Sequence, residues 1–72
     1  MSNVHTQAYQ KFLKRLRQAR VEAKLSQVTV AKKLRKPQSF VSKIESGERR
    51  LDFVEVHSLA KLYGKPLSFF HS

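Results

Sequence analysis

The chain has 72 residues and no cysteine, so we expect one small domain without disulfides or cysteine-based metal sites. Fifteen Lys and Arg residues against five Asp and Glu residues give a formal net charge of +10, which favours a polyanionic partner. No apolar run approaches the roughly 18 residues needed to span a membrane, and the start of the chain has no apolar signal stretch. We therefore expect a cytoplasmic protein with no membrane partner.

The positive charge is concentrated in the first two-thirds of the chain. Residues 1–50 hold thirteen of the basic residues and three of the acidic ones, whereas residues 51–72 hold two of each. Half of residues 51–72 are apolar. This division predicts an anion-binding part followed by a part that forms a core or contacts a protein.

The first predicted helix follows a polar tail at residues 1–6, which we expect to be flexible. Residues 7–72 would then form the single domain. From Gln7 to about Ala23, apolar residues recur at spacings of three and four, which is the period of a helix with one buried face. The apolar positions are Phe12, Leu13, Leu16, Ala19 and Ala23.

Two short helices follow, separated by only a few residues. Ser26 is a good N-cap residue for the second helix, and Pro37 stops that helix because the residue before a proline is pushed out of the α region. The third helix should run from Pro37 or Gln38 to Ser46, with Gly47 ending it in the left-handed conformation. The short gap between the two helices predicts a helix-turn-helix unit at about residues 26–47.

The fourth helix has the clearest start signal, because Asp52 and Glu55 form an Asp-x-x-Glu capping box. Its predicted buried face consists of Phe53, Val56, Leu59, Ala60 and Tyr63. Gly64 ends this helix, and Pro66 can start a final short helix that carries Leu67, Phe69 and Phe70. The predicted fold class is therefore all-α.

Two segments of the chain resemble the XRE family, the helix-turn-helix repressors of the lambda-repressor and Cro type. These are Leu-Ser-Gln-Val-Thr-Val-Ala-Lys-Lys-Leu at residues 25–34 and Val-Ser-Lys-Ile-Glu-Ser-Gly-Glu-Arg at residues 41–49. The resemblance covers roughly residues 10–70 and implies a five-helix lambda-repressor-like domain that binds double-stranded DNA, with its third helix in the major groove.

The sequence departs from the family pattern in the turn of the helix-turn-helix. Arg35 stands where the family often has a glycine in the left-handed conformation, and Lys36 stands at a position that is usually apolar. An arginine pays a conformational cost there that glycine does not. We therefore expect a reshaped turn, tightened by Pro37.

The resemblance also assigns the candidate DNA-binding residues. Gln27 would contact the DNA backbone or an edge base, and the outward face of the third helix, formed by Gln38, Ser39, Ser42 and Lys43, would read bases. Lys36, Arg49 and Arg50, with Arg35 as a further candidate, would bind phosphates. Phe40 has two readings, since it can touch a thymine methyl group or fold back onto the turn.

Two further sets of residues are expected to have structural roles. The resemblance places Arg20 beside Glu45, where a bidentate ion pair would position the helices. A symmetric dimer would use apolar residues of the C-terminal third, namely Val54, Leu62, Leu67, Phe69 and Phe70. In the alternative, Leu67 and Phe70 close the core and the protein stays monomeric until DNA brings two copies together.

The sequence gives no basis for catalysis, a metal site, a cofactor or a small-molecule ligand. The three histidines lie far apart, and no nucleophile stands beside a base in any recognisable pattern. We expect a sequence-specific transcriptional repressor that acts as a dimer on a palindromic operator. An antitoxin or a restriction–modification controller would use the same domain, and a basic module that binds RNA or an anionic membrane is the alternative from another class.

Overall fold

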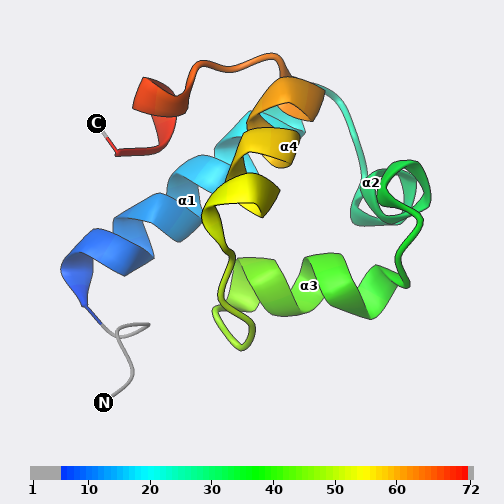
Figure 1. Cartoon of the computed structure of the whole chain (residues 1–72), viewed down its shortest axis with the longest axis horizontal. Coiled ribbons are helices and arrows are strands. Elements are labelled where there is room, and N and C mark those ends of the chain that lie inside the picture. The colour runs from blue at the N-terminus through cyan, green and yellow to red at the C-terminus, as the bar shows by residue number, and fades with distance from the viewer. Residues whose placement is uncertain (1–5, 72) are drawn as a thin grey trace.

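The computed structural model describes residues 6–71, and the elements within this range are all helical (Figure 1). In chain order they are α1 (Gln7–Glu22), α2 (Gln27–Leu34), α3 (Gln38–Ser46), α4 (Phe53–Tyr63) and the 3-10 helix η1 (Leu67–His71). The all-α prediction is confirmed, but the described part holds four α-helices, and the fifth predicted helix is a 3-10 helix instead. No helix among these residues is long and apolar enough to cross a membrane.

Helix α1 begins at Gln7, as the sequence predicts, and the residue before it caps the helix. The Thr6 hydroxyl accepts a hydrogen bond from the Tyr9 N–H at 3.1 Å, so Thr6 is the N-cap of α1. Thr6, which the sequence analysis assigned to the tail, therefore satisfies one of the free N–H groups of the helix. The other predicted tail residues, 1–5, lie outside the described residues.

Helix α2 starts directly after Ser26, as predicted, and ends before Arg35 and Lys36. Ser26 caps it by accepting from the Thr29 N–H at 3.1 Å, and the last helical residue is Leu34. Arg35 then takes the left-handed conformation with a φ of 58°, and the Lys36 N–H donates to the Ala31 carbonyl at 2.9 Å. The prediction of a reshaped turn is wrong, since Arg35 adopts the conformation that a glycine would have and closes the helix in the usual way.

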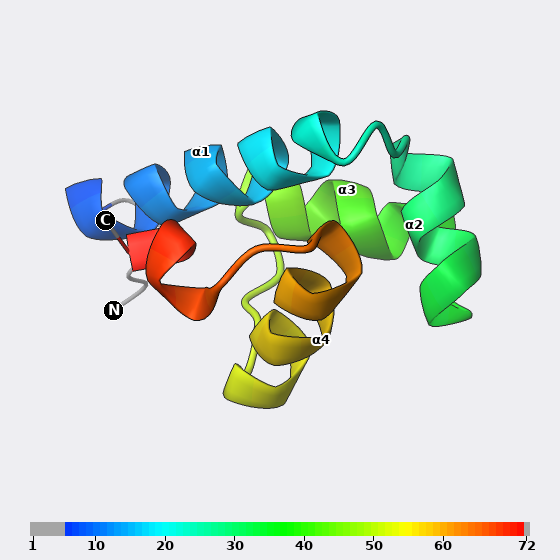
Figure 2. The same ribbon diagram turned by 90° about the horizontal axis from the view of Figure 1, so that it is seen from above.

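The core lies where α1 meets the α2–α3 pair, α4 and η1. Its most deeply buried large side chains are Leu16, Val30 and Ile44, one from each of the first three helices. Figure 2 shows α1 running along one side of the molecule, with α3 beside it and η1 against its N-terminal half. Short helices with few buried residues each are thus held together by one shared cluster, which fixes the orientation of α3 relative to α1.

The C-terminal third closes this core with a different aromatic residue from the one predicted. The capping box is present, with the Glu55 N–H donating to Asp52 at 2.7 Å and the Asp52 N–H donating to Glu55 at 3.1 Å. Phe53, predicted to be in the core, is 70% exposed, whereas Phe70 is 3% exposed and meets Phe12 edge to face. The prediction that Phe70 belongs to a dimer interface is therefore wrong, because its ring is already buried within one chain.

Candidate nucleic-acid interface

Helix α3 presents a polar outward face because its two apolar residues anchor the opposite side. Val41 and Ile44 are buried in the core, which turns Gln38, Ser39 and Lys43 outward as exposed residues. Within residues 6–71 the structure shows no side-chain partner for Gln38 or Lys43. This face can therefore offer an amide and an ammonium group to base edges without first breaking an internal bond.

The remaining polar residue of this face, Ser42, is half-buried and its hydroxyl is engaged. The Ser42 Oγ donates to the Ser39 carbonyl at 3.2 Å, one turn earlier in α3. A hydroxyl that donates internally can still accept a hydrogen bond from a base. Ser46, one turn after Ser42, is exposed and its hydroxyl donates to the Lys43 carbonyl at 3.1 Å.

Gln27, Arg20 and Glu45 form one hydrogen-bonded network at the junction of α1, α2 and α3. Arg20 donates from Nε to Glu45 Oε2 at 2.6 Å and from Nη2 to Glu45 Oε1 at 3.2 Å, while its Nη1 donates to the Leu25 carbonyl at 2.9 Å. The Arg20 and Glu45 side chains are only 11% and 7% exposed, and their hydrogen bonds raise the pKa of Arg20. The structure thus brings this predicted pair together, with most of both side chains shielded from solvent.

The Gln27 side chain joins the same network instead of standing free at the start of α2. Its Nε2 donates to Glu45 Oε1 at 3.0 Å, which was not anticipated from the sequence. An amide nitrogen has two hydrogens, so one N–H of Gln27 is fixed by Glu45 and the other is left for a further acceptor. Glu45 therefore sets the orientation of Gln27 as well as the packing of α1 against α3.

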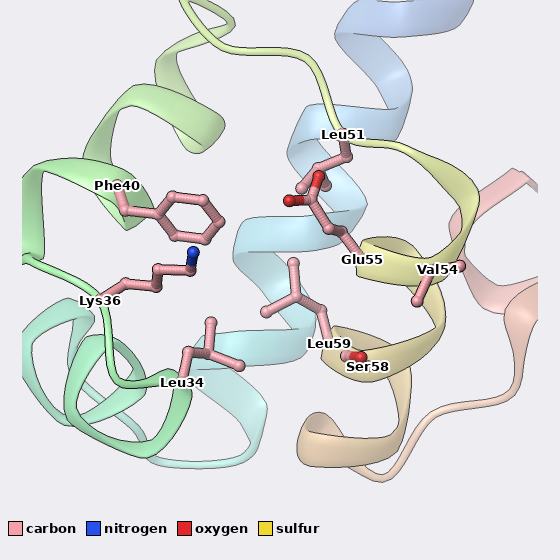
Figure 3. Close-up of a pocket in the computed structure, with 8 residues that line it drawn as sticks. All are labelled: Leu34, Lys36, Phe40, Leu51, Val54, Glu55, Ser58 and Leu59. Carbon is pink, nitrogen blue, oxygen red and sulfur yellow. The ribbon is translucent and has the colours of Figure 1, made fainter.

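Phe40 is folded back against the body of the protein. Its ring packs on the core cluster and lines an apolar cleft of about 160 Å³ between α3 and α4, together with Leu34, Leu51 and Leu59 (Figure 3). The Arg49 guanidinium lies 4.6 Å from the ring centre and the Lys36 ammonium 5.3 Å from it. Of the two readings of Phe40, the structure shows the fold-back, with two cations placed over the ring.

The two arginines after α3 differ in how far their charge is compensated. Arg49 binds Glu55 through two hydrogen bonds of 3.0 Å, and this guanidinium lowers the pKa of the Glu55 carboxyl group. Arg50 has no acidic partner within residues 6–71, and its guanidinium lies 5.1 Å from the Tyr9 ring centre in α1. Arg50 is therefore the better placed of the two to donate to an external anion, and Arg35 is exposed as well.

The predicted interface residues of the C-terminal third fall into two groups. Val54 is 70% exposed, whereas Leu62, Leu67 and Phe69 are partly buried and pack against the core. Phe53, which the sequence pattern assigned to the core, precedes Val54 and is also 70% exposed. The centre of its ring lies 5.2 Å from the centre of the His57 ring. The exposed apolar patch of α4 thus consists of Phe53 and Val54 at the start of the helix.

No group of three or more His, Cys, Asp or Glu residues that could hold a metal ion occurs among the described residues. The apolar cleft holds a glutamate whose oxygens are bound by Arg49 and by the Asp52 N–H.

A comparison with protein families gives one result, which covers most of the chain. A family described as helix-turn-helix matches residues 16–70, a range that begins within α1 and ends within η1. No curated protein and no solved structure gives a significant match.

Proposed function

Because the chain belongs to the helix-turn-helix family of the XRE type and is a DNA-binding regulator, we propose that it is a sequence-specific repressor acting as a dimer on a palindromic operator. The observation that carries this proposal is the outward face of α3. Gln38 and Lys43 are exposed there and have no partner within the described part of the chain. Bound in the major groove, such a face reads bases through hydrogen bonds.

Gln38 and Lys43 would make the base contacts with the greatest discrimination. A glutamine amide can bind adenine through two hydrogen bonds, and a lysine can reach the acceptor atoms of guanine. Ser39 and Ser42 lie on the same face and would contribute single hydrogen bonds. Phe40 takes no part in this readout, because its ring is held in the cleft between α3 and α4.

The cations and amides that flank α3 would hold it in register by binding phosphates. Gln27 keeps one N–H free of Glu45 at the exposed N-terminus of α2, where the helix's own N–H groups also favour an anion. Within residues 6–71, Arg35 and Arg50 form no ion pair with an acidic residue, whereas Lys36 lies near Glu55 and Arg49 is hydrogen-bonded to Glu55. Contacts of this kind position the protein on DNA without reading sequence.

A dimer is proposed because one short helix reads too few base pairs to select a single genomic site. The C-terminal third suits an interface, since residues 51–72 carry no net charge while the first 50 residues carry all of it. Phe53 and Val54 form its most exposed apolar patch, with Leu62, Leu67 and Phe69 as partly exposed neighbours. Two copies joined there would double the readout and place two recognition helices about one DNA turn apart.

The function is tested by competition between polyanions, followed by a measurement of stoichiometry. A labelled duplex selected from a random pool should be displaced by the same duplex, and at least about a hundredfold less well by scrambled duplex, structured RNA or vesicles rich in phosphatidylserine. Sedimentation should give two protein chains per palindromic duplex. Equal displacement by RNA or vesicles would contradict the proposed function, and one chain per duplex at saturation would contradict the dimer.

A further inference from the structure

Helix α1 carries a positive charge that lies outside the helix-turn-helix unit. Lys11, Lys14, Arg15 and Arg17 follow one another in α1, and its single acidic residue comes at the end. That residue, Glu22, already accepts from Lys65 at 2.6 Å and from Gln18 at 2.9 Å. None of the four cations forms an ion pair with an acidic residue within residues 6–71.

The cations of α1 reach two neighbouring elements, η1 and α3. On the side of η1, the Arg15 guanidinium lies 5.1 Å from the centre of the Phe69 ring. On the side of α3, the exposed Lys14 and Arg17 line a shallow hollow of about 170 Å³, together with Gln10 and Leu13. The remaining wall of that hollow is formed by Glu45 and Ser46 in the last turn of α3.

Lys14 and Arg17 thus stand beside the end of the helix that reads DNA. Helix α1 packs against α3 (Figure 2), and Ser46 lies one turn beyond Ser42 on the outward face of α3. The one carboxylate in the hollow does not repel an anion strongly, since both oxygens of Glu45 accept from Arg20 and one also accepts from Gln27. Within residues 6–71, Lys14 and Arg17 have no acidic partner of their own.

We propose that Lys14 and Arg17 bind a backbone phosphate of the DNA at the edge of the major groove, beyond the base pairs that α3 reads. This inference rests on the proposed function. A major groove about 12 Å wide is filled by one helix, so an element packed beside that helix meets the phosphates at the groove's edge. A lysine and an arginine one turn apart can hold one phosphate through charge-assisted hydrogen bonds.

The first test compares two double variants that remove the same charge. The probe is the best duplex selected from a random pool, with affinity measured by fluorescence anisotropy at several KCl concentrations. Lys14→Gln with Arg17→Gln should leave the selected sequence unchanged and make the slope of log K against log salt shallower by about one, because one phosphate contact is lost. The control, Lys11→Gln with Lys61→Gln, should leave that slope nearly unchanged, and equal changes in both variants would overturn the proposal.

The second test locates the contact on the DNA. In a series of duplexes, one phosphate at a time is replaced by a neutral methylphosphonate, and the wild-type chain should lose about tenfold in affinity at each contacted position. The Lys14→Gln, Arg17→Gln variant should be insensitive at one or two of those positions, outside the selected base pairs. A variant as sensitive as the wild type at every position would overturn the proposal, whereas a wild type without preference for duplex DNA would instead contradict the proposed function.

Discussion

Helices α3 and α4 each bury a few apolar residues and expose the rest, but their exposed faces have opposite chemistry. The face of α3 offers Gln38 and Lys43, whereas the start of α4 offers Phe53 and Val54. The buried stripe of each helix serves the same core, so it does not distinguish their roles. The outward residues do, since hydrogen-bonding groups suit base edges and an apolar pair suits another protein surface.

The comparison extends to the charges around the two helices. Next to α3, Glu45 accepts hydrogen bonds from Arg20 and Gln27, while the nearby Arg35 and Arg50 form no ion pair in the described part of the chain. At the start of α4, the Glu55 carboxylate accepts hydrogen bonds from the N-cap N–H of Asp52 and from Arg49. Glu45 in the first region thus orients Gln27, a proposed DNA-binding residue, and Glu55 in the second region holds the start of α4 in place.

The largest expected change in stability comes from comparing Phe70, which is buried, with Phe53, which was predicted to be buried but is exposed. Phe70→Ala should lower the free energy of unfolding by about 3–5 kcal/mol, because it empties a buried site against Phe12. Phe53→Ala should change it by less than about 0.5 kcal/mol, since that ring is mostly in solvent. Urea denaturation of both variants measures the difference, and similar losses would show that Phe53 is part of the core after all.

The next effect concerns the network beside α3. Glu45→Ala should cost about 3 kcal/mol of unfolding free energy, because it leaves the Arg20 guanidinium nearly buried without its carboxylate. The matched control is Glu48→Ala, where the carboxylate is exposed and the expected change is under about 0.5 kcal/mol. Thermal melts compare the two, and equal losses would mean that the network contributes little to stability.

A charge placed on the apolar patch of α4 tests whether this patch is the proposed dimer interface. Val54→Glu should weaken self-association by at least about tenfold, equal to 1.4 kcal/mol, because a carboxylate would be desolvated at the interface. Val21→Glu on α1 makes the same chemical change at a residue that is 56% exposed, and should leave association unaltered. Sedimentation equilibrium gives both constants, and an unchanged dimer in Val54→Glu would move the interface away from the start of α4.

The smallest effect compares two helix ends that share one backbone conformation. Arg35 ends α2 and Gly64 ends α4, with φ values of 58° and 69°. Arg35→Gly should raise stability by roughly 0.5 kcal/mol, because glycine adopts this conformation without the steric cost. Gly64→Ala should lower stability by about 1 kcal/mol through backbone strain alone, since no atom lies within 4 Å of the added methyl group. Changes of the same sign in melting temperature would contradict this account.

The helix boundaries could be predicted from sequence because the groups that set them are close in the chain. Ser26 caps α2 by accepting from the N–H of Thr29, three residues later, and Asp52 and Glu55 form the capping box of α4 within one turn. Arg35 was the exception. Its conformation could not be deduced from its own preference, because the hydrogen bond from Lys36 to Ala31 closes the helix whatever side chain stands between.

Which apolar residues reach the core could not be predicted from periodicity alone. Phe53 lies on the correct side of α4, but it is the first residue of that helix and projects beyond the neighbouring helices. Phe70 reaches the core because η1 folds back onto α1. The position of each ring depends on how the helices are placed, which a helical repeat does not specify.

Of the contacts around α3, the Arg20–Glu45 ion pair was predicted and two others were not. Arg20 and Glu45 are 25 residues apart, so no local pattern joins them, and the family resemblance was needed. The bond between Gln27 and Glu45 and that between Arg49 and Glu55 were missed, because each residue has several possible partners of suitable chemistry. Tertiary geometry decides among such partners.

The most direct test of the account is the sequence preference of variants on the outward face of α3. Duplexes selected from a random pool by Lys43→Ala or Gln38→Ala should lose information at one or two base pairs of each half-site, with affinity for the original site reduced by about 1–3 kcal/mol. Arg50→Ala, the phosphate-binding control, should select the same sequence as the wild type with uniformly weaker binding. If Lys43→Ala and Gln38→Ala both selected the wild-type sequence with full information, α3 would not be the helix that reads DNA.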